Sequence, residues 1–173
     1  MNASPGLREG GPTVVAIGGG HGLAASLRAA RRYAGQLTAV VSVADDGGSS
    51  GRLRQAAPVL PPGDIRKCLV ALAAQQTTLV TALEHRFSAG DVAGHAMGNL
   101  LLASLDAVLD DPVAAIDEVA RLVNAVGRVL PAAIEPVILV GTRSDRSQVR
   151  GQVAVMAAEG IVAVRLDPGS PAV

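Results

Sequence analysis

Aromatic side chains are almost absent from this sequence of 173 residues, which has no tryptophan, one tyrosine (Tyr33) and one phenylalanine (Phe87). Proteins that bind single-stranded nucleic acid stack the bases on aromatic rings, so this scarcity counts against that function. An excess of charge is absent too, because 15 basic residues balance 15 acidic ones. The chain therefore lacks the electrostatic attraction that DNA and anionic membranes exert on basic proteins. We expect no nucleic-acid partner.

Cysteine and long apolar runs are also scarce. Cys68 is the one cysteine, so no disulfide can form within the chain, which is typical of a reducing cytosol. The longest nearly apolar stretch, around residues 100–109, is too short to span a bilayer, and the first residues lack the apolar core of a signal peptide. We expect a cytoplasmic protein without membrane insertion, with a disordered segment at 1–12 and a single nucleotide-binding domain at 13–173.

The most informative stretch is 41–54, VSVADDGGSSGRLR, which ends the β-branched run of 37–43. The run predicts a buried strand, and the glycines after it let a ligand approach the main chain. Two carboxylates, two hydroxyls and a guanidinium together suit a ligand that has both hydroxyl and phosphate groups, such as a nucleotide. A solvated Gly/Ser loop with an Asx cap is the alternative. The candidate ligand residues here are Asp45, Asp46, Gly47, Gly48, Ser49, Ser50 and Arg52.

Upstream of this stretch, the pattern predicts a βαβ unit. A strand at 13–17, a glycine loop at 18–22 and a helix at 23–33 precede the strand at 37–43. Gly20, Gly22 and Ala25 have the spacing of a dinucleotide fingerprint, and Asp45 lies where that fold places its ribose-binding acid. We expect phosphate at the helix N-terminus. The candidate residues of this loop are Gly18, Gly19, Gly20, His21 and Gly22.

Two further glycine-containing loops also precede helices. In the first, Pro-Pro-Gly-Asp leads into a helix at 65–74, and Asp64 is either its N-cap or a ligand residue. In the second, Gly94 to Gly98 leads into an apolar helix at 100–109, where Asn99 is either a cap or a group at the cleft. The candidate residues of these loops are Gly63, Asp64, Arg66, His95 and Asn99.

The rest of the chain predicts helices at 77–87 and 113–126, the second begun by Pro112 and ended by Gly127 as its C′ residue. Short β-rich runs predict strands at 137–140, 149–155 and 161–166, the last two as a hairpin. The histidines and Cys68 do not have the spacing of zinc ligands, and neither a Walker A sequence nor a G-x-S-x-G elbow occurs. We expect no catalytic residue and no metal site.

Six motifs occur in an order and spacing that resemble a known family: IGGGHGL (17–23), VSVADDGGSSGRLR (41–54), PPGDIRKCLVAL (61–72), HRF (85–87), GHAMGNLLLASL (94–105) and GRVLPA (127–132). From about residue 13 to the end, the chain resembles YvcK-type gluconeogenesis factors of the CofD-like superfamily, which is named for 2-phospho-L-lactate transferase. The transferase branch usually lacks the Gly-Gly-Ser-Ser-Gly-Arg continuation, so the resemblance favours the regulatory branch. His21 stands where many members have threonine.

The resemblance implies an α/β, Rossmann-like parallel sheet with flanking helices and the ligand UDP-N-acetylglucosamine. It also implies a role in cell-wall precursor supply and cell shape during gluconeogenic growth. A cell-wall precursor enzyme, a serine/threonine kinase and a second copy of the chain are the candidate protein partners. Members of the family are roughly twice as long, so we expect the N-terminal half of the family domain, with the sheet truncated before it is complete.

Three functional hypotheses follow. The first is a non-catalytic nucleotide-sugar sensor that requires no cofactor, with phosphates on the loop at 18–22 and hydroxyl or base contacts from Asp45 and Asp46. The second is a transferase of the CofD type, in which the aspartates would hold Mg²⁺. The third is an NAD(P)-dependent oxidoreductase, for which no catalytic set of residues is evident.

Overall fold

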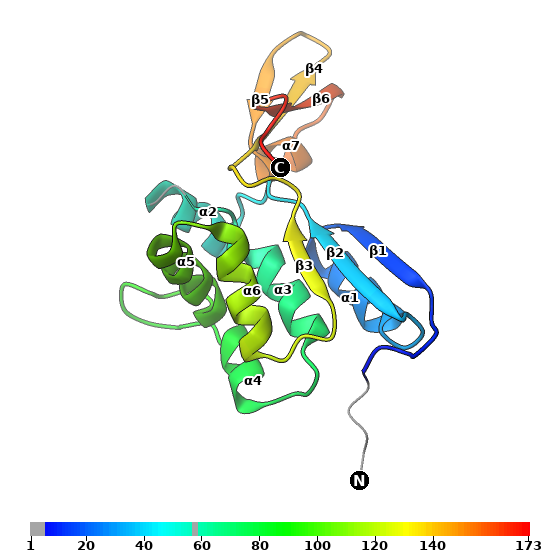
Figure 1. Cartoon of the computed structure of the whole chain (residues 1–173). Coiled ribbons are helices and arrows are strands. Elements are labelled where there is room, and N and C mark those ends of the chain that lie inside the picture. The colour runs from blue at the N-terminus through cyan, green and yellow to red at the C-terminus, as the bar shows by residue number, and fades with distance from the viewer. Residues whose placement is uncertain (1–5, 57–58) are drawn as a thin grey trace.

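A computed structural model describes residues 6–56 and 59–173 and consists of a helical α/β body with a small antiparallel unit beside it (Figure 1). Of the N-terminal segment expected to be disordered, residues 1–5 lie outside the described residues. Residues 6–12 run beside the turn after the first helix, where the Arg8 amide donates to the Ala34 carbonyl at 2.7 Å. No helix among the described residues is long and apolar enough to cross a membrane.

The body is built on a three-stranded parallel sheet in the order β1-β2-β3. The strands are β1 (Thr13–Gly18), β2 (Gln36–Val41) and β3 (Arg128–Pro131). The sequence predicted the first two, and their parallel pairing confirms the Rossmann-like expectation. The third strand was not predicted. It is four residues long and ends in a proline, so it carries little of the β-branched signal on which such predictions depend.

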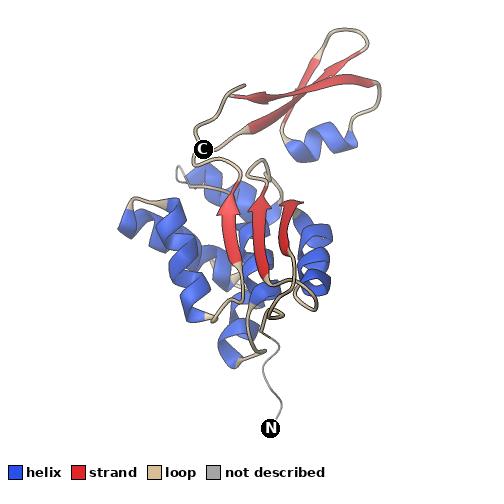
Figure 2. Ribbon diagram, turned by 45° about the vertical axis from the view of Figure 1, so that its right-hand side comes forward, coloured by secondary structure: helices blue, strands red, loops and turns tan. Residues whose placement is uncertain are grey.

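Helices cover one face of this sheet. Buried positions alternate along β2, and Val129 continues the pattern on β3. The side chains that face the helices are those of Leu37, Ala39, Val41 and Val129. The other face of β1 is open, with Ile17 78% exposed. Figure 2 shows the three strands in front, with the helices behind and beside them. The helices of the body are α1 (Gly20–Ala30), α2 (Gly48–Ala56), α3 (Pro62–Leu72), α4 (Thr78–Glu84), α5 (Met97–Leu109) and α6 (Pro112–Leu122).

Several helix boundaries differ from the predictions. Helix α1 begins at Gly20 and α2 at Gly48, so two of the glycine-rich segments expected as loops form first helical turns. Helix α6 begins at Pro112, as expected, but ends at Leu122 instead of at Val126. Asn124 takes the left-handed conformation after this helix, with φ of 49°. Gly127 is needed for another reason, since a Cβ there would lie 2.6 Å from the Leu37 carbonyl oxygen.

The antiparallel unit has the strand order β5-β4-β6 and lies at the top of Figure 1. Its elements are β4 (Ile138–Arg143), β5 (Gln148–Arg150), α7 (Gln152–Ala157) and β6 (Ile161–Asp167). The predicted strand at 149–155 is wrong beyond Arg150, because Gly151 has φ of 99° and a helix follows it. The predicted hairpin is wrong too, since β5 and β6 both pair with β4.

Candidate functional site

Two pockets meet at the carboxyl ends of β1 and β2. Asp45, which follows β2, and Lys67 on α3 line both of them. The glycine-loop pocket is lined by Gly18, Gly19, Gly20, Ser42, Asp45, Asp64, Lys67, Gln152, Val153 and Met156. The basic pocket is lined by Asp45, Gly47, Gly48, Ser49, Ser50, Gly63, Arg66, Lys67, Arg86 and Asn99. Ligands of open α/β sheets bind at this edge.

The first turn of α1 is closed by a carboxylate from α3. Asp64 Oδ2 accepts a hydrogen bond from the Gly20 amide at 2.6 Å, and Oδ1 pairs with Lys67 Nζ at 2.8 Å. The glycine before it is required for this approach, because a Cβ at Gly19 would lie 2.7 Å from Asp64 Oδ2. The N-cap of α3 is Pro61, so the interpretation of Asp64 as that cap is wrong. Asp64 instead satisfies the N-terminus of the neighbouring helix.

A chain of polar side chains builds the wall of the basic pocket. Arg66 Nε donates to Asn99 Oδ1, and Asn99 Nδ2 donates to Ser49 Oγ, both at 3.0 Å. Ser50 Oγ accepts from the Gly63 amide at 3.0 Å. Ser49, Ser50 and Asn99 are all buried. Asn99 lies inside the first turn of α5, whose N-cap is Ala96, so it is not the cap. This network fixes the starts of α2, α3 and α5 relative to one another.

His95 completes the chain. Its Nδ1 lies 3.0 Å from Ser49 Oγ. Ser49 Oγ also accepts from Asn99, and its hydroxyl hydrogen can be donated to Nδ1 when the imidazole is neutral and unprotonated at that nitrogen. Burial lowers the pKa of His95, and the positive charges of Arg52 and Arg86 lower it further. The environment therefore favours the neutral form of His95.

The two adjacent aspartates point to different places. Asp45 Oδ1 accepts from the Gly47 amide at 3.0 Å, and its side chain lines both pockets. Asp46 Oδ1 accepts from the Val153 amide at 3.0 Å and lines a separate hollow between α2 and β4. No group of three or more His, Cys, Asp or Glu side chains within 6–56 and 59–173 could hold a metal ion. A Mg²⁺ ion on Asp45 would thus need phosphate oxygens and water as its other ligands.

Four other sequence-predicted residues line neither pocket, and one of them, His95, contacts the wall of the basic pocket through Ser49. His21 and Gly22 are exposed on α1. Arg52 is exposed on α2 and approaches Gly94, where a Cβ would lie 2.7 Å from Arg52 Nη2. The helix that begins at Gly20 turns His21 and Gly22 away from the Asp64 carboxylate.

Sequence reasoning missed several lining residues. Lys67 and Arg86 lay within the quoted motifs PPGDIRKCLVAL and HRF but were not singled out. Arg86 reaches the site because residues 86 and 96 form an isolated antiparallel bridge. The other missed residues are Ser42, Gln152, Val153 and Met156. The last three come from α7, whose helical conformation was not predicted.

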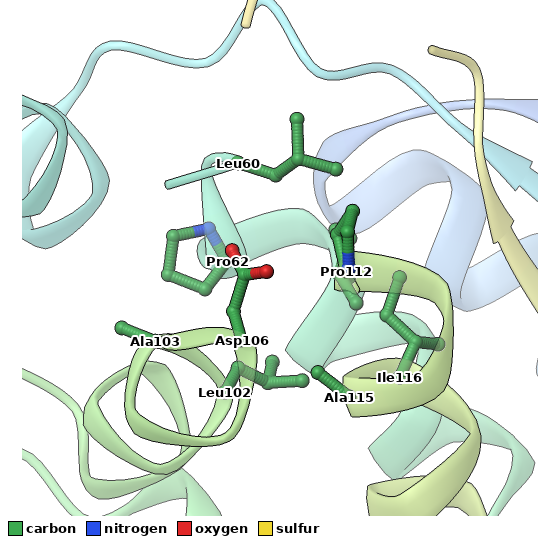
Figure 3. Close-up of a pocket in the computed structure, with 9 residues that line it drawn as sticks. Leu60, Pro62, Leu102, Ala103, Asp106, Pro112, Ala115 and Ile116 are labelled. Carbon is green, nitrogen blue, oxygen red and sulfur yellow. The ribbon is translucent and has the colours of Figure 1, made fainter. Parts of the chain in front are cut away.

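A fourth pocket lies between α3, α5 and α6, and it is largely apolar (Figure 3). Leu60, Leu102 and Ile116 contribute to its walls, and the Asp106 carboxylate projects among them. Burial raises the pKa of Asp106, and the negative charges of Asp110 and Asp111 raise it further, against a hydrogen bond from the Leu60 amide. The glycine loops contribute no residue to this pocket.

The geometry of glycine-rich helix starts around Asp45 has counterparts in known proteins. Residues 14–172 match the model of the family described as 2-phospho-L-lactate transferase CofD. The chain belongs to the CofD family. A family member from Mycobacterium tuberculosis (strain CDC 1551 / Oshkosh) is 51% identical in a match that covers 91% of this chain and 50% of that protein. The gluconeogenesis factor of Halalkalibacterium halodurans is 43% identical over 82% of this chain and 44% of its own.

A crystal structure of a protein from Bacillus halodurans has the same CofD-family fold. It superposes with a TM-score of 0.88 at 40% identity, over 92% of this chain and 52% of that one. This agreement confirms the α/β fold with its parallel sheet, and the relatives above confirm the resemblance to the gluconeogenesis factors. The chain spans about half the length of the curated relatives it matches.

Proposed function

We propose that this protein is a cytoplasmic regulatory protein that binds UDP-N-acetylglucosamine and helps to direct carbon to cell-wall precursors, and so to maintain cell shape, during gluconeogenic growth. The observation that carries the proposal is the pair of pockets joined at Asp45 and Lys67. A nucleotide-sugar has hydroxyl-rich ends on either side of a diphosphate. One pocket offers main chain and carboxylate groups, and the other offers cations and hydroxyls.

The Asp45 carboxylate suits a sugar or ribose hydroxyl. Its Oδ1 is held by the Gly47 amide, and carboxylate oxygens are strong acceptors for hydroxyl donors. The neighbouring Lys67 ammonium is already paired with Asp64, so it serves both to neutralise that carboxylate and to attract an anionic ligand. In this arrangement the protein would bind its ligand without supplying a nucleophile.

The alternative is a transferase of the CofD type, which the family description favours. In that case Asp45 would contribute to a Mg²⁺ site completed by the phosphates of the substrate. The NAD(P)-dependent reading remains third. It needs the start of α1 for a pyrophosphate, and the Gly20 amide there already donates to Asp64.

Thermal unfolding of the 173-residue chain, with and without UDP-N-acetylglucosamine, tests the proposal. GDP and NADP⁺ are the control ligands. A ligand at 100 times its dissociation constant stabilises the native state by about 2.7 kcal/mol, so the UDP-sugar should raise the unfolding temperature more than either control does at the same concentration. A cooperative transition that no UDP-sugar moves would refute the proposal. Product formation from a nucleotide-activated phospholactate would establish the transferase instead.

A further inference from the structure

The first amide of α1, at the helix start that the glycine fingerprint marks for phosphate, is already paired within the protein. The Gly20 amide donates to Asp64 Oδ2 at 2.6 Å. Lys67 holds the other oxygen of the same carboxylate. A phosphate placed here would meet a fixed negative charge and would have to displace it. The Asp64 carboxylate thus occupies the position at the start of α1 where the helix dipole would favour a phosphate.

The start of α2 has the opposite surroundings. Around it the basic pocket carries three basic side chains, Arg66, Lys67 and Arg86, against the single carboxylate of Asp45. The hydroxyl of Ser50 lies beside the start of α3, where it accepts from the Gly63 amide. Backbone amides at a helix start and adjacent cations are the groups that bind oxyanions. Lys67 is paired with Asp64, and the Glu84 carboxylate acts on Arg66. The cations of this pocket that face an oxyanion where two helices begin are therefore Arg66 and Arg86.

Arg66 supplies the observation that points to a ligand. Its side chain is buried, with an exposed fraction of 7%, yet its one hydrogen bond within the described part of the chain is made by Nε to Asn99. Both terminal nitrogens are left to the pocket that Arg66 lines. A buried guanidinium is costly unless its donors are satisfied, and its two parallel N–H groups match the oxygens of a phosphate.

We propose that the basic pocket is the phosphate site of this protein, with Arg66 as its buried anchor, and that the glycine loop of α1 does not bind phosphate. The assignment rests on the proposed function only for the identity of the molecule that carries the phosphate. Arg86 and the free amides of Gly48 to Ser50 complete the set of donors. Asp45 then lies between the phosphate and the glycine-loop pocket, where it is placed to accept from a hydroxyl of the same ligand.

Titration of the ¹⁵N-labelled chain with inorganic pyrophosphate tests the proposal. Amide resonances of Gly48, Ser49 and Ser50 should shift and saturate, while that of Gly20 should not. Arg66→Gln should weaken pyrophosphate binding at least tenfold, and Arg28→Gln, on the exposed side of α1, should leave it unchanged. Asp64→Asn should not weaken it. Saturable shifts centred on Gly20, or unchanged affinity in a folded Arg66→Gln protein, would overturn the assignment.

Two further measurements keep the test decisive. If Arg66→Gln does not fold, Arg86→Gln replaces it, since Arg86 is exposed, and it should weaken pyrophosphate binding several-fold. A parallel titration with UDP-N-acetylglucosamine separates the two proposals. Binding of pyrophosphate without the UDP-sugar supports the phosphate site and refutes the proposed function. Binding of the UDP-sugar with shifts at Gly20 supports the proposed function and refutes the phosphate site. If neither binds, both are refuted.

Discussion

Asp46 and Val153 are 107 residues apart in the chain, yet Asp46 Oδ1 accepts a hydrogen bond from the Val153 amide at 3.0 Å. This contact joins the end of β2 to the first turn of α7, and it places Val153 and Met156 over the glycine-loop pocket. The second of the two neighbouring aspartates therefore holds one wall of the pocket in place, while the first faces its interior.

Asp46→Ala should loosen α7 without unfolding the body. Loss of a hydrogen bond worth about 1 kcal/mol corresponds to about fivefold faster opening. Hydrogen exchange at the Val153 amide should accelerate by that factor, and exchange in α3 should not change. Asp117→Asn, on the exposed side of α6, is the matched control. Unchanged exchange at Val153 would show that packing alone holds α7.

Gly151→Ala should destabilise the antiparallel unit. Gly151 has φ of 99°, where an alanine is strained by about 1–2 kcal/mol, and its new Cβ would press against Asp46 Oδ2. Urea unfolding should show that loss or more. Gly6→Ala is the comparison, because a Cβ there meets nothing within 4 Å and φ is not in the left-handed range. Equal stability of the two variants would contradict the expected backbone strain at position 151.

The Ser49–His95 contact should make stability depend on pH. The pKa of His95 is lowered by burial and by Arg52 and Arg86, so the neutral ring stabilises the fold. This contribution is fully present above the unfolded value, about 6.5, and is lost as the pH falls through the lower folded value. Unfolding temperatures measured between pH 8 and pH 5 should therefore fall less in His95→Asn than in the natural chain. A parallel decline in both proteins would show that His95 is not linked to folding.

The contribution of Asp106 to stability should have the opposite pH dependence to that of His95. Burial and the charges of Asp110 and Asp111 raise its pKa, so the fold is favoured by the protonated carboxyl. The penalty for ionisation is absent below the ordinary value of 3.8 and is complete above the raised one. Asp106→Asn should thus raise the unfolding temperature at pH 7 and lose that advantage near pH 3. A gain that is equal at both pH values would point to packing instead of charge.

The sequence predicted the strands and glycines at the edge of the site but not the contacts that bring Asp64 and Arg86 to it. The strands at 13–17 and 37–43 were recognisable from β-branched residues, and the glycines after them marked the sheet edge. Sequence spacing could not show that Asp64 on α3 reaches the Gly20 amide, because the two residues meet only through packing of α3 against α1. Arg86 was missed for a similar reason, since it is positioned by a bridge across the loop to Ala96.

The error at α7 has a different cause. Five of its six residues, Gln152–Ala157, are apolar, with valines two apart, a pattern that short strands and short helices share. The backbone at Gly151 and the contact with Asp46 decide in favour of the helix. The local pattern left both structures open, and a tertiary contact from more than a hundred residues away contributes to the choice.

The pairing of β2 with β3 also governs the order in which the fold can assemble. Val41 pairs with Pro131, whereas β1 and β2 are joined by a single helix. Closure of the longer connection costs more chain entropy, and distant pairing slows folding. During synthesis, β1, α1 and β2 leave the ribosome well before β3. We expect the unpaired edge of β2 to remain exposed through that interval, which is when the chain is most vulnerable to aggregation.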